Sequence, residues 1–420
     1  MKYCSKAKKI KSVSHTPSKD QALISPSIQI DGETSLVLFD QIGKFKEDWE
    51  KIIPSNIFFS VPFLELIEND PPVGIKPFYA LMTRDGTHIA LLSLQLKAID
   101  LAESMNLDAD SQEMSMSQKI AQSAKKAVAK ITKFNTLICG NVLLTGEYGF
   151  YFADKTILYA DQFQLVESAL DQIIKTLPQF GYKAGPILMK DFYGDKEFSI
   201  NDNINSTFTE FAVQPNMIFQ LKEDWKNFDD YMAAIKSKYR VRVKRAIKKL
   251  GEVEKRELSS DDITEHNQRL YDLYMETANE ADFNLFTLPV HYFTNLKKYL
   301  QEKIKIVAYF LNGEMIGYYT ILFNSEYMEA HYLGYDKSKN GQRQIYLNML
   351  FDLVKEGINH QVGTIQFART ALEIKSSVGA VPYDMHCYLK HPKKALNAIA
   401  PRMLSFMVPV EDWQPRSPFK

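Results

Sequence analysis

The feature that most constrains the fold of this chain is an order of strands and helices that occurs twice. Spacings of apolar residues predict this order in the second half as a strand at 253–258, helices after Ser259 and from Pro289, strands at 304–311, 315–323 and 327–335, a helix at 342–358 and a strand at 364–367. The first half repeats it at 35–39, 45–53, 62–69, 78–83, 89–96, 134–144, 162–177 and 186–189. Asp85-Gly86 and Asn312-Gly313 predict a tight hairpin at the same place in each copy. We therefore expect two copies of one fold.

Chain length supports this duplication. At 420 residues the chain exceeds what a single hydrophobic core usually serves. We expect a flexible basic tail at 1–30, an N-terminal domain at 31–220 and a C-terminal domain at 221–420. Each domain is predicted to be an α/β (α+β) unit in which helices flank a mixed, mostly antiparallel sheet.

Composition and charge exclude several classes of function. Lysine plus arginine equal aspartate plus glutamate at 51 each, so the whole-chain charge does not point to nucleic acid. The three cysteines lack the spacing of a disulfide framework or a metal site, and no metal is expected. The sequence contains no nucleotide-binding glycine loop and no hydrolase elbow. Because it also has no apolar run long enough for a membrane span and no secretory signal, we expect a cytoplasmic protein.

Two basic segments stand out from this neutral background. An insert at 102–133, absent from the second copy, has apolar residues on one helical face and five lysines on the other. Such a helix either lies on an anionic membrane surface or packs on its own domain with a solvated lysine face. A helix at 226–250, which opens the C-terminal domain, has eight cations between 236 and 249 and no acid among them. These cations favour contact with an anionic partner, such as tRNA, a carrier protein or phospholipid.

The duplicated order resembles the GNAT acyltransferase fold, and its tandem arrangement resembles the FemAB-like peptidoglycan aminoacyltransferases and related tandem-GNAT proteins. Three segments carry the resemblance: the basic segment 225–246, the run Gly334-Tyr335-Asp336 and the motif at 367–382. Over roughly residues 220–390 the similarity rests on these motifs. In the first half it rests on the order of strands and helices. It implies an amide-forming transferase that takes its group from a thioester or an aminoacyl-tRNA.

The strand at 327–335 carries the predicted catalytic residues. Glu329, His331 and Leu333 are expected on one face because side chains alternate along a strand. Because histidine generally titrates near working pH, His331 is a candidate base for the amine, with Glu329 orienting it or acting in its place. Tyr335, at the end of the strand, completes the candidate catalytic set. The alternative is a core histidine hydrogen-bonded to a neighbouring strand.

A site for the donor's phosphates is predicted where this strand passes through a loop at 336–341 into the helix at 342–358. The resemblance implies that free N–H groups at the start of this helix face the pyrophosphate. The residues expected there are Lys337, Lys339, Gly341 and Arg343. A single glycine departs from the Gln/Arg-x-x-Gly-x-Gly/Ala pattern of acetyl-CoA-dependent GNATs and disfavours acetyl-CoA itself. An ordinary basic surface turn is the alternative.

Recognition of the acceptor is assigned to three further cations. Arg369 and Lys375 follow the last strand, where a GNAT-like sheet opens toward its substrate cleft, and Arg240 lies in the basic helix. An arginine in such a cleft can clamp a carboxylate or phosphate with two hydrogen bonds. A helical ion pair between Arg369 and Glu373 is the competing account.

The leading hypothesis is an N-acyltransferase that moves an acyl group from acyl-CoA or an acyl-carrier protein to the amine of a lipid or cell-envelope precursor. It would hold no resident cofactor and work at the inner membrane face, in peripheral contact with anionic lipid. Two alternatives stay open. One is a Fem-like transfer of an amino acid from aminoacyl-tRNA to a peptidoglycan precursor, and the other is a recognition protein that kept the fold without the chemistry.

Overall fold

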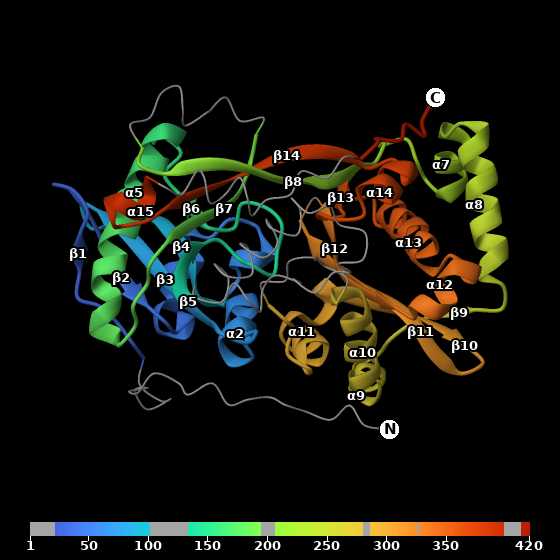
Figure 1. Ribbon diagram of the computed structural model, residues 1–420, viewed down its shortest axis with the longest axis horizontal. Helices are drawn as coiled ribbons and strands as arrows, with labels where there is room; N and C mark the ends of the chain where they lie inside the picture. Colours follow the sequence, from blue (N-terminus) through green and yellow to red (C-terminus); the bar gives the residue numbers. More distant parts are fainter. Residues whose placement is uncertain (1–21, 101–132, 195–205, 280–285, 326, 399–412) are drawn as a thin grey trace, which may run out of the picture.

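The computed structural model describes residues 22–100, 133–194, 206–279, 286–325, 327–398 and 413–420. The predicted amphipathic insert at 102–133, except for its last residue, and most of the predicted tail at 1–30 lie outside these residues. The domain boundary near residue 220 stays a prediction. The mixed α/β fold with a large sheet flanked by helices is confirmed (Figure 1).

One sheet of 14 strands runs through the described part of the chain. Its strands are β1 (Ile28–Gln29), β2 (Thr34–Phe39), β3 (Ile75–Arg84), β4 (Thr87–Asp100), β5 (Lys133–Cys139), β6 (Phe150–Phe152), β7 (Ile187–Tyr193), β8 (Thr209–Gln220), β9 (Glu254–Glu257), β10 (Ile304–Leu311), β11 (Glu314–Asn324), β12 (Tyr327–Tyr335), β13 (Thr364–Gln366) and β14 (Val381–Lys390). In space they follow the order β1-β2-β3-β4-β5-β7-β14-β8-β13-β12-β11-β10-β9, with β6 paired to β4. Strands β8 and β14 cross between the two halves (Figure 1).

The duplication is visible in the strand directions. In each half one pair of neighbouring strands is parallel, β5 with β7 and β12 with β13, and the other described pairs are antiparallel. Each half also has its predicted hairpin, in which both turn residues have positive φ: 48° and 77° at Asp85-Gly86, and 51° and 80° at Asn312-Gly313. Such φ angles suit the tight turns that match the twist of two antiparallel strands. The two parallel pairs lie on either side of β14 and β8.

Helices cover both faces of the sheet. They are α1 (Lys46–Ile52), α2 (Val61–Asn69), α5 (Tyr159–Thr176), α7 (Phe228–Ala234), α8 (Ser237–Leu250), α9 (Ser260–Glu265), α10 (Asn267–Ala278), α11 (Tyr292–Leu300), α12 (Lys337–Arg343), α13 (Ile345–Asn359), α14 (Leu372–Val378) and α15 (Lys394–Asn397). Among the described residues, no helix is long and apolar enough to cross a membrane.

Three hydrophobic cores follow from the alternation of side chains along the strands. One core spans both halves and holds the apolar faces of α1, α2, α9, α10 and α11. On the other face of the sheet, α5 covers the first half and α8, α13 and α14 cover the second. Tyr318 and Tyr319 illustrate the division, because these neighbours in β11 lie in different cores.

Two helix boundaries differ from the sequence predictions. The helix expected from Pro289 begins at Tyr292, whose N–H donates to the Pro289 carbonyl in a turn before the helix. The continuous helix expected at 226–250 is divided between α7 and α8. At this break, Ile235 pairs with Phe419 and the Lys236 N–H donates to the Pro418 carbonyl, so the C-terminal segment takes the hydrogen bonds that a continuous helix would use.

The predicted loop at 336–341 is also wrong, because residues 337–341 are helical. The Asp336 side chain caps α12 by accepting a hydrogen bond from the Ser338 N–H at 2.9 Å. The helix predicted from residue 342 begins instead at Ile345, after Gln344 adopts a left-handed conformation with φ of 51°.

A close approach of β12 to α10 gives a test of this packing. A Cβ at Gly334 would lie 2.5 Å from the Leu273 carbonyl carbon and 2.7 Å from the Tyr274 nitrogen, and these backbone atoms have no room to rotate away. We expect Gly334→Ala to lower the free energy of unfolding by about 1–3 kcal/mol in urea denaturation.

Gly341→Ala is the matched control for this substitution. Gly341 lies within α12, and a Cβ there would meet nothing within 4 Å. Alanine favours a helix over glycine by about 1 kcal/mol, so this variant should be as stable as the wild type or more so. Equal denaturation midpoints for the two variants would contradict the packing of β12 on α10.

Candidate active site

A β-bulge in β12 sets the direction of the predicted catalytic side chains. Two residues of β12, His331 and Tyr332, lie opposite the single residue Thr320 of β11. The Thr320 hydroxyl stabilises the bulge, because it donates to the Tyr332 carbonyl and accepts from the Tyr332 N–H, both at 2.8 Å. Leu333 was predicted to share a face with Glu329 and His331. It packs instead in the core with α13, because the extra residue reverses the alternation.

His331 is held by the helical layer. Its Nε2 lies 2.7 Å from the Tyr292 hydroxyl of α11, and no hydrogen bond joins it to Glu329 in the described part of the chain. Burial lowers the pKa of His331 to about 3. Its imidazole is therefore neutral and a weak base, and the expectation that Glu329 orients it is wrong.

Glu329 is a buried carboxyl with an unpartnered oxygen. The residue is 2% exposed, and its Oε2 has no hydrogen-bond partner among the described residues. Burial raises the pKa of Glu329 well above its ordinary value, although Lys375 and Lys190 act in the opposite direction. A buried polar atom without a partner costs about 1–3 kcal/mol, and such atoms and perturbed pKa values concentrate at functional sites.

Lys375 of α14 is the first of the cations that act electrostatically on this carboxyl. It is 5% exposed, and its Nζ donates to the Ala368 carbonyl at 3.2 Å and to the Arg369 carbonyl at 2.5 Å. Burial lowers the pKa of Lys375 to about 7, against the opposing influence of Glu329. Lys375 can therefore gain or lose a proton near neutral pH.

The loop that Lys375 holds has an unusual backbone. Ala368, Thr370 and Ala371 have φ angles of 57°, 67° and 49°, although none is glycine. Left-handed conformations of such residues cost about 1–3 kcal/mol each and persist where the surrounding structure over-determines them. The two hydrogen bonds from Lys375 to this loop help to hold the loop in this conformation.

Arg369 projects from the same loop to a charged group of the first half. Its guanidinium forms an ion pair with Asp191 of β7, which also pairs with Lys190. Burial alone would raise the pKa of Asp191, but Lys190 and Arg369 together hold it below its ordinary value. The alternative pairing of Arg369 with Glu373 is wrong, because Glu373 bonds to Arg416 at 3.1 Å.

Tyrosines surround these charges. The Tyr148 hydroxyl lies 3.0 Å from the Tyr327 hydroxyl, and burial and Glu329 raise the pKa of both groups above the ordinary value. The Tyr193 hydroxyl accepts a hydrogen bond from Asn216 at 2.9 Å. We call the set of eight residues the junction cluster; its members are Tyr148, Lys190, Asp191, Tyr193, Tyr327, Glu329, Arg369 and Lys375.

Sequence reasoning found three members of the junction cluster, Glu329, Arg369 and Lys375. It missed the members from the first half, because there the resemblance rests on pattern without a motif. The adjacent charges of Lys190 and Asp191 inside an otherwise apolar strand were the available signal.

Other predicted site residues lie away from the junction cluster. Lys339 pairs with Asp336 at 2.5 Å and Glu314 at 3.4 Å, and Arg343 donates to the Leu250 carbonyl at 3.0 Å. The N–H of Lys337 donates to Glu276 at 3.1 Å, and Gly341 lies in α12 without a positive φ.

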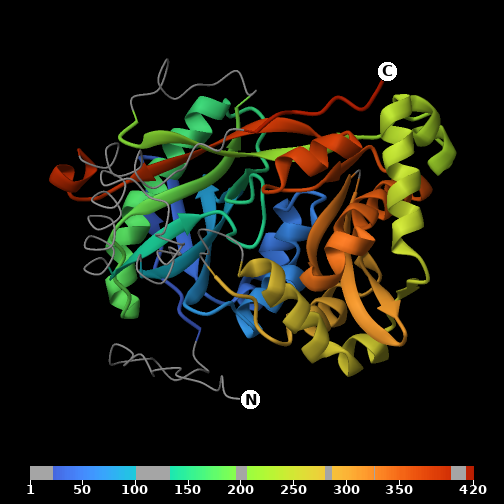
Figure 2. The ribbon, with the colours of Figure 1, turned by 45° about the vertical axis from the view of Figure 1, so that its right-hand side comes forward.

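The two remaining candidates also have other surroundings. Tyr335 stacks on Tyr346, with 5.7 Å between ring centroids. Arg240 donates to the Ile235 carbonyl at 2.5 Å and lies in α8, at the outer end of the second half (Figure 2).

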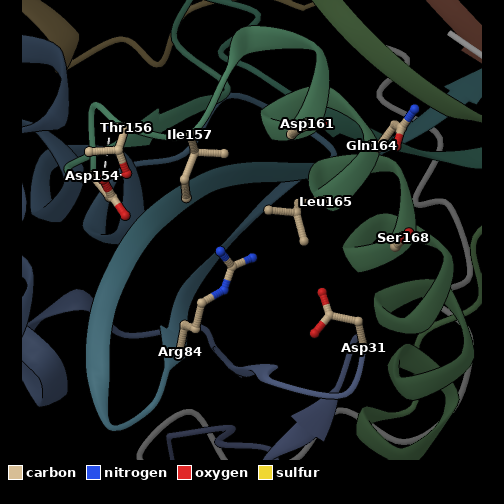
Figure 3. A pocket seen from close by; sticks show the side chains of 9 residues that line it. All are labelled: Asp31, Arg84, Asp154, Thr156, Ile157, Asp161, Gln164, Leu165 and Ser168. Atoms are coloured by element: carbon tan, nitrogen blue, oxygen red, sulfur yellow. Dashed lines mark hydrogen bonds between the residues drawn. The ribbon is translucent and has the colours of Figure 1, made fainter.

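A surface depression of about 520 Å³ lies on the first half, far along the sheet from β12. Its lining includes Asp31, Arg84, Asp154, Thr156, Asp161 and Gln164 (Figure 3). It contains no residue of the junction cluster. Among the described residues, no group of three or more His, Cys, Asp or Glu side chains is arranged to hold a metal ion.

Comparisons with known proteins agree with this architecture. Residues 201–341 match the FemAB-like family model, described as peptidoglycan biosynthesis/recognition. A crystal structure of FemX is 12% identical with a TM-score of 0.50, and the match covers 85% of this chain and 98% of that one. At this identity the similarity shows the fold. The predicted GNAT-like fold and the resemblance to FemAB-like proteins are confirmed.

Two further solved structures are similar at lower scores. A tandem GNAT protein from the clavulanic acid biosynthesis pathway is 8% identical, with a TM-score of 0.44 and coverage of 88% of this chain and 98% of that one. A GCN5-related N-acetyltransferase from Sphaerobacter thermophilus is 9% identical, with a TM-score of 0.40 and coverage of 74% and 80%. No curated protein matches the chain significantly.

The neutral state of His331 predicts a pH dependence of stability. Its pKa falls from 6.5 to about 3 on folding, so below about pH 6 the unfolded chain binds a proton that the folded chain does not. Because of this residue, each decrease of one pH unit then lowers the free energy of unfolding of the wild type by about 1.4 kcal/mol. His331→Gln lacks this contribution, so the wild type should lose stability relative to the variant between pH 6 and pH 4. Urea denaturation at both pH values measures the difference, and a constant difference would contradict the assignment.

Proposed function

We propose that this chain forms an amide by moving an acyl-type group onto the amine of a lipid or cell-envelope precursor, with the reaction at the junction cluster. The observation that carries the proposal is that two buried groups, Glu329 and Lys375, influence each other electrostatically, one a carboxyl with an unpartnered oxygen and the other a lysine with a pKa of about 7. The match to FemAB-like proteins supports the reaction class.

Lys375 is suited to remove the proton of the attacking amine. In its neutral form its two N–H bonds serve the Ala368 and Arg369 carbonyls, and its lone pair is left to accept a proton. When the pKa of a base lies near the working pH, a large fraction of the base is unprotonated and it still binds a proton strongly enough to take one from the amine. Lys375 therefore replaces His331 as the proposed base.

Glu329 is suited to the opposite transfer. A protonated carboxyl can donate to the oxygen or sulfur of the leaving group as the C–O or C–S bond breaks. The new C–N bond forms while the amine's proton passes to Lys375. Lys375 then returns a proton to Glu329, so the net transfer is from the amine to the leaving group and both side chains regain their starting states.

Two donors satisfy this scheme. The first is an acyl thioester of CoA or a carrier protein, and the second is an aminoacyl-tRNA. The second is favoured by the match of residues 201–341 to FemAB-like proteins and by the hydrogen bonds that already engage Lys339 and Arg343. These hydrogen bonds would have to break before the predicted phosphate site could bind a donor. That site consists of Lys337, Lys339, Gly341 and Arg343.

Cells with and without this protein distinguish the candidates. Mass spectrometry of amine-containing lipids and peptidoglycan precursors should find one N-acylated product lost and its free amine accumulated. A lipid product supports the thioester donor, whereas a shortened peptidoglycan cross-bridge supports aminoacyl-tRNA. Unchanged lipids and precursors would contradict a transferase and favour the recognition protein.

Substitution of Lys375 tests the proposed base. Lys375→Met keeps the length of the side chain and removes the amine, so product formation in complemented cells should fall about 100-fold or more. Lys375→Arg should be equally inactive, because arginine stays charged at neutral pH. The activity of the wild type should rise with pH through about 7 as Lys375 loses its proton.

Lys298→Met is the matched control, because Lys298 is an exposed residue of α11 outside the junction cluster. This variant should form product at the wild-type rate. If Lys375→Met folds and also forms product at that rate, Lys375 is not the base.

A further inference from the structure

Helix α8 has one buried face and a broad exposed arc. Tyr239, Val243, Ala246 and Leu250 are buried and pack in the core of the second half. The exposed arc has six cations: Lys238, Arg242, Lys244, Arg245, Lys248 and Lys249. The helix lies at the outer end of the second half (Figures 1 and 2).

These six cations have no acidic partner among the described residues, and residues 236–251 contain no acid. Elsewhere basic side chains commonly pair, as Lys305 does with Glu257 and Glu356. The chain as a whole has 51 basic and 51 acidic residues. The positive charge of α8 is therefore a local feature of this helix and not a consequence of the overall charge, and it suits an anionic partner.

Apolar side chains lie among these charges. Val241 is 53% exposed and Ile247 is 50% exposed. At 3.6 residues per turn, Val241 projects from the middle of the exposed arc, with Lys244 and Lys248 to one side and Lys238 and Arg245 to the other. Long cationic side chains can reach outward from such a surface while aliphatic groups between them enter an apolar layer.

We propose that α8 docks the protein on an anionic phospholipid surface. Amphipathic helices bind such membranes by contacts of lysine and arginine with the headgroups and by shallow insertion of apolar side chains, and Val241 is placed for this insertion. No aromatic side chain lies on the exposed arc, since Tyr239 is buried. The arc thus has no stacking platform for single-stranded nucleic acid. The inference does not depend on the chemistry of the junction cluster.

Vesicle sedimentation tests this surface in the full-length protein. The wild type should bind vesicles of phosphatidylglycerol and phosphatidylcholine and should not bind vesicles of phosphatidylcholine alone. Each cation near an anionic surface strengthens binding about fivefold, so the charge reversals Lys244→Glu and Lys248→Glu together should weaken it at least tenfold. Val241→Asp should weaken binding as well, because the apolar contact is lost.

Lys175→Glu with Lys183→Glu is the matched control. Both lysines are exposed in the first half, and the pair changes the net charge by the same amount. This variant should bind anionic vesicles like the wild type, and so should Lys375→Met, which separates docking from catalysis.

Three outcomes would overturn the proposal. The first is a wild type that does not bind anionic vesicles, and the second is equal weakening by the two charge-reversal pairs. The third is binding that Val241→Asp leaves unchanged and that tRNA abolishes by competition, which would make α8 a nucleic-acid surface. Circular dichroism of each variant confirms that the helix is retained.

Discussion

Strand β14 is the element on which the junction cluster depends. It pairs with β7 of the first half along one edge and with β8 along the other, so that one continuous sheet joins the two copies. His386 of β14, for example, lies opposite both Phe192 and Ala212. Because the loop before α14 lies next to this crossing, Arg369 of that loop reaches Asp191 of β7 and joins the charges of the two halves.

The burial of these charges costs free energy, and the protein compensates each charge to a different extent. Asp191 lies between two cations, Lys190 and Arg369, and so is compensated within the protein. Glu329 and Lys375 are compensated less completely, and burial shifts their pKa values toward the neutral forms. Replacing a buried ion pair by apolar residues generally leaves a protein equally stable, so a purely structural contact between two domains does not need buried charges. The incomplete pairing of Glu329 and Lys375 is therefore the feature on which the proposed reactive site rests.

The elements that the sequence predicts well are those that local chemistry determines. The Asn312-Gly313 turn requires two left-handed residues, and Ser259 with Asp262 forms the capping box that begins α9. Alternation identified the face of Glu329 and His331 but could not identify the bulge, because the Thr320 hydroxyl that stabilises it belongs to another strand. The role of Asp191 depends on Arg369, which lies far away in the sequence. Such features are set by tertiary contacts that no local pattern encodes.

The protonation of Lys375 is the measurement that tests the central claim most directly. NMR of the protein with 15N-labelled lysine can follow its amine during a pH titration, with the signal assigned by its loss in Lys375→Met. The account predicts a midpoint near pH 7. A Lys375 amine that stays charged to pH 9 could not accept the proton of an attacking amine and would contradict the account.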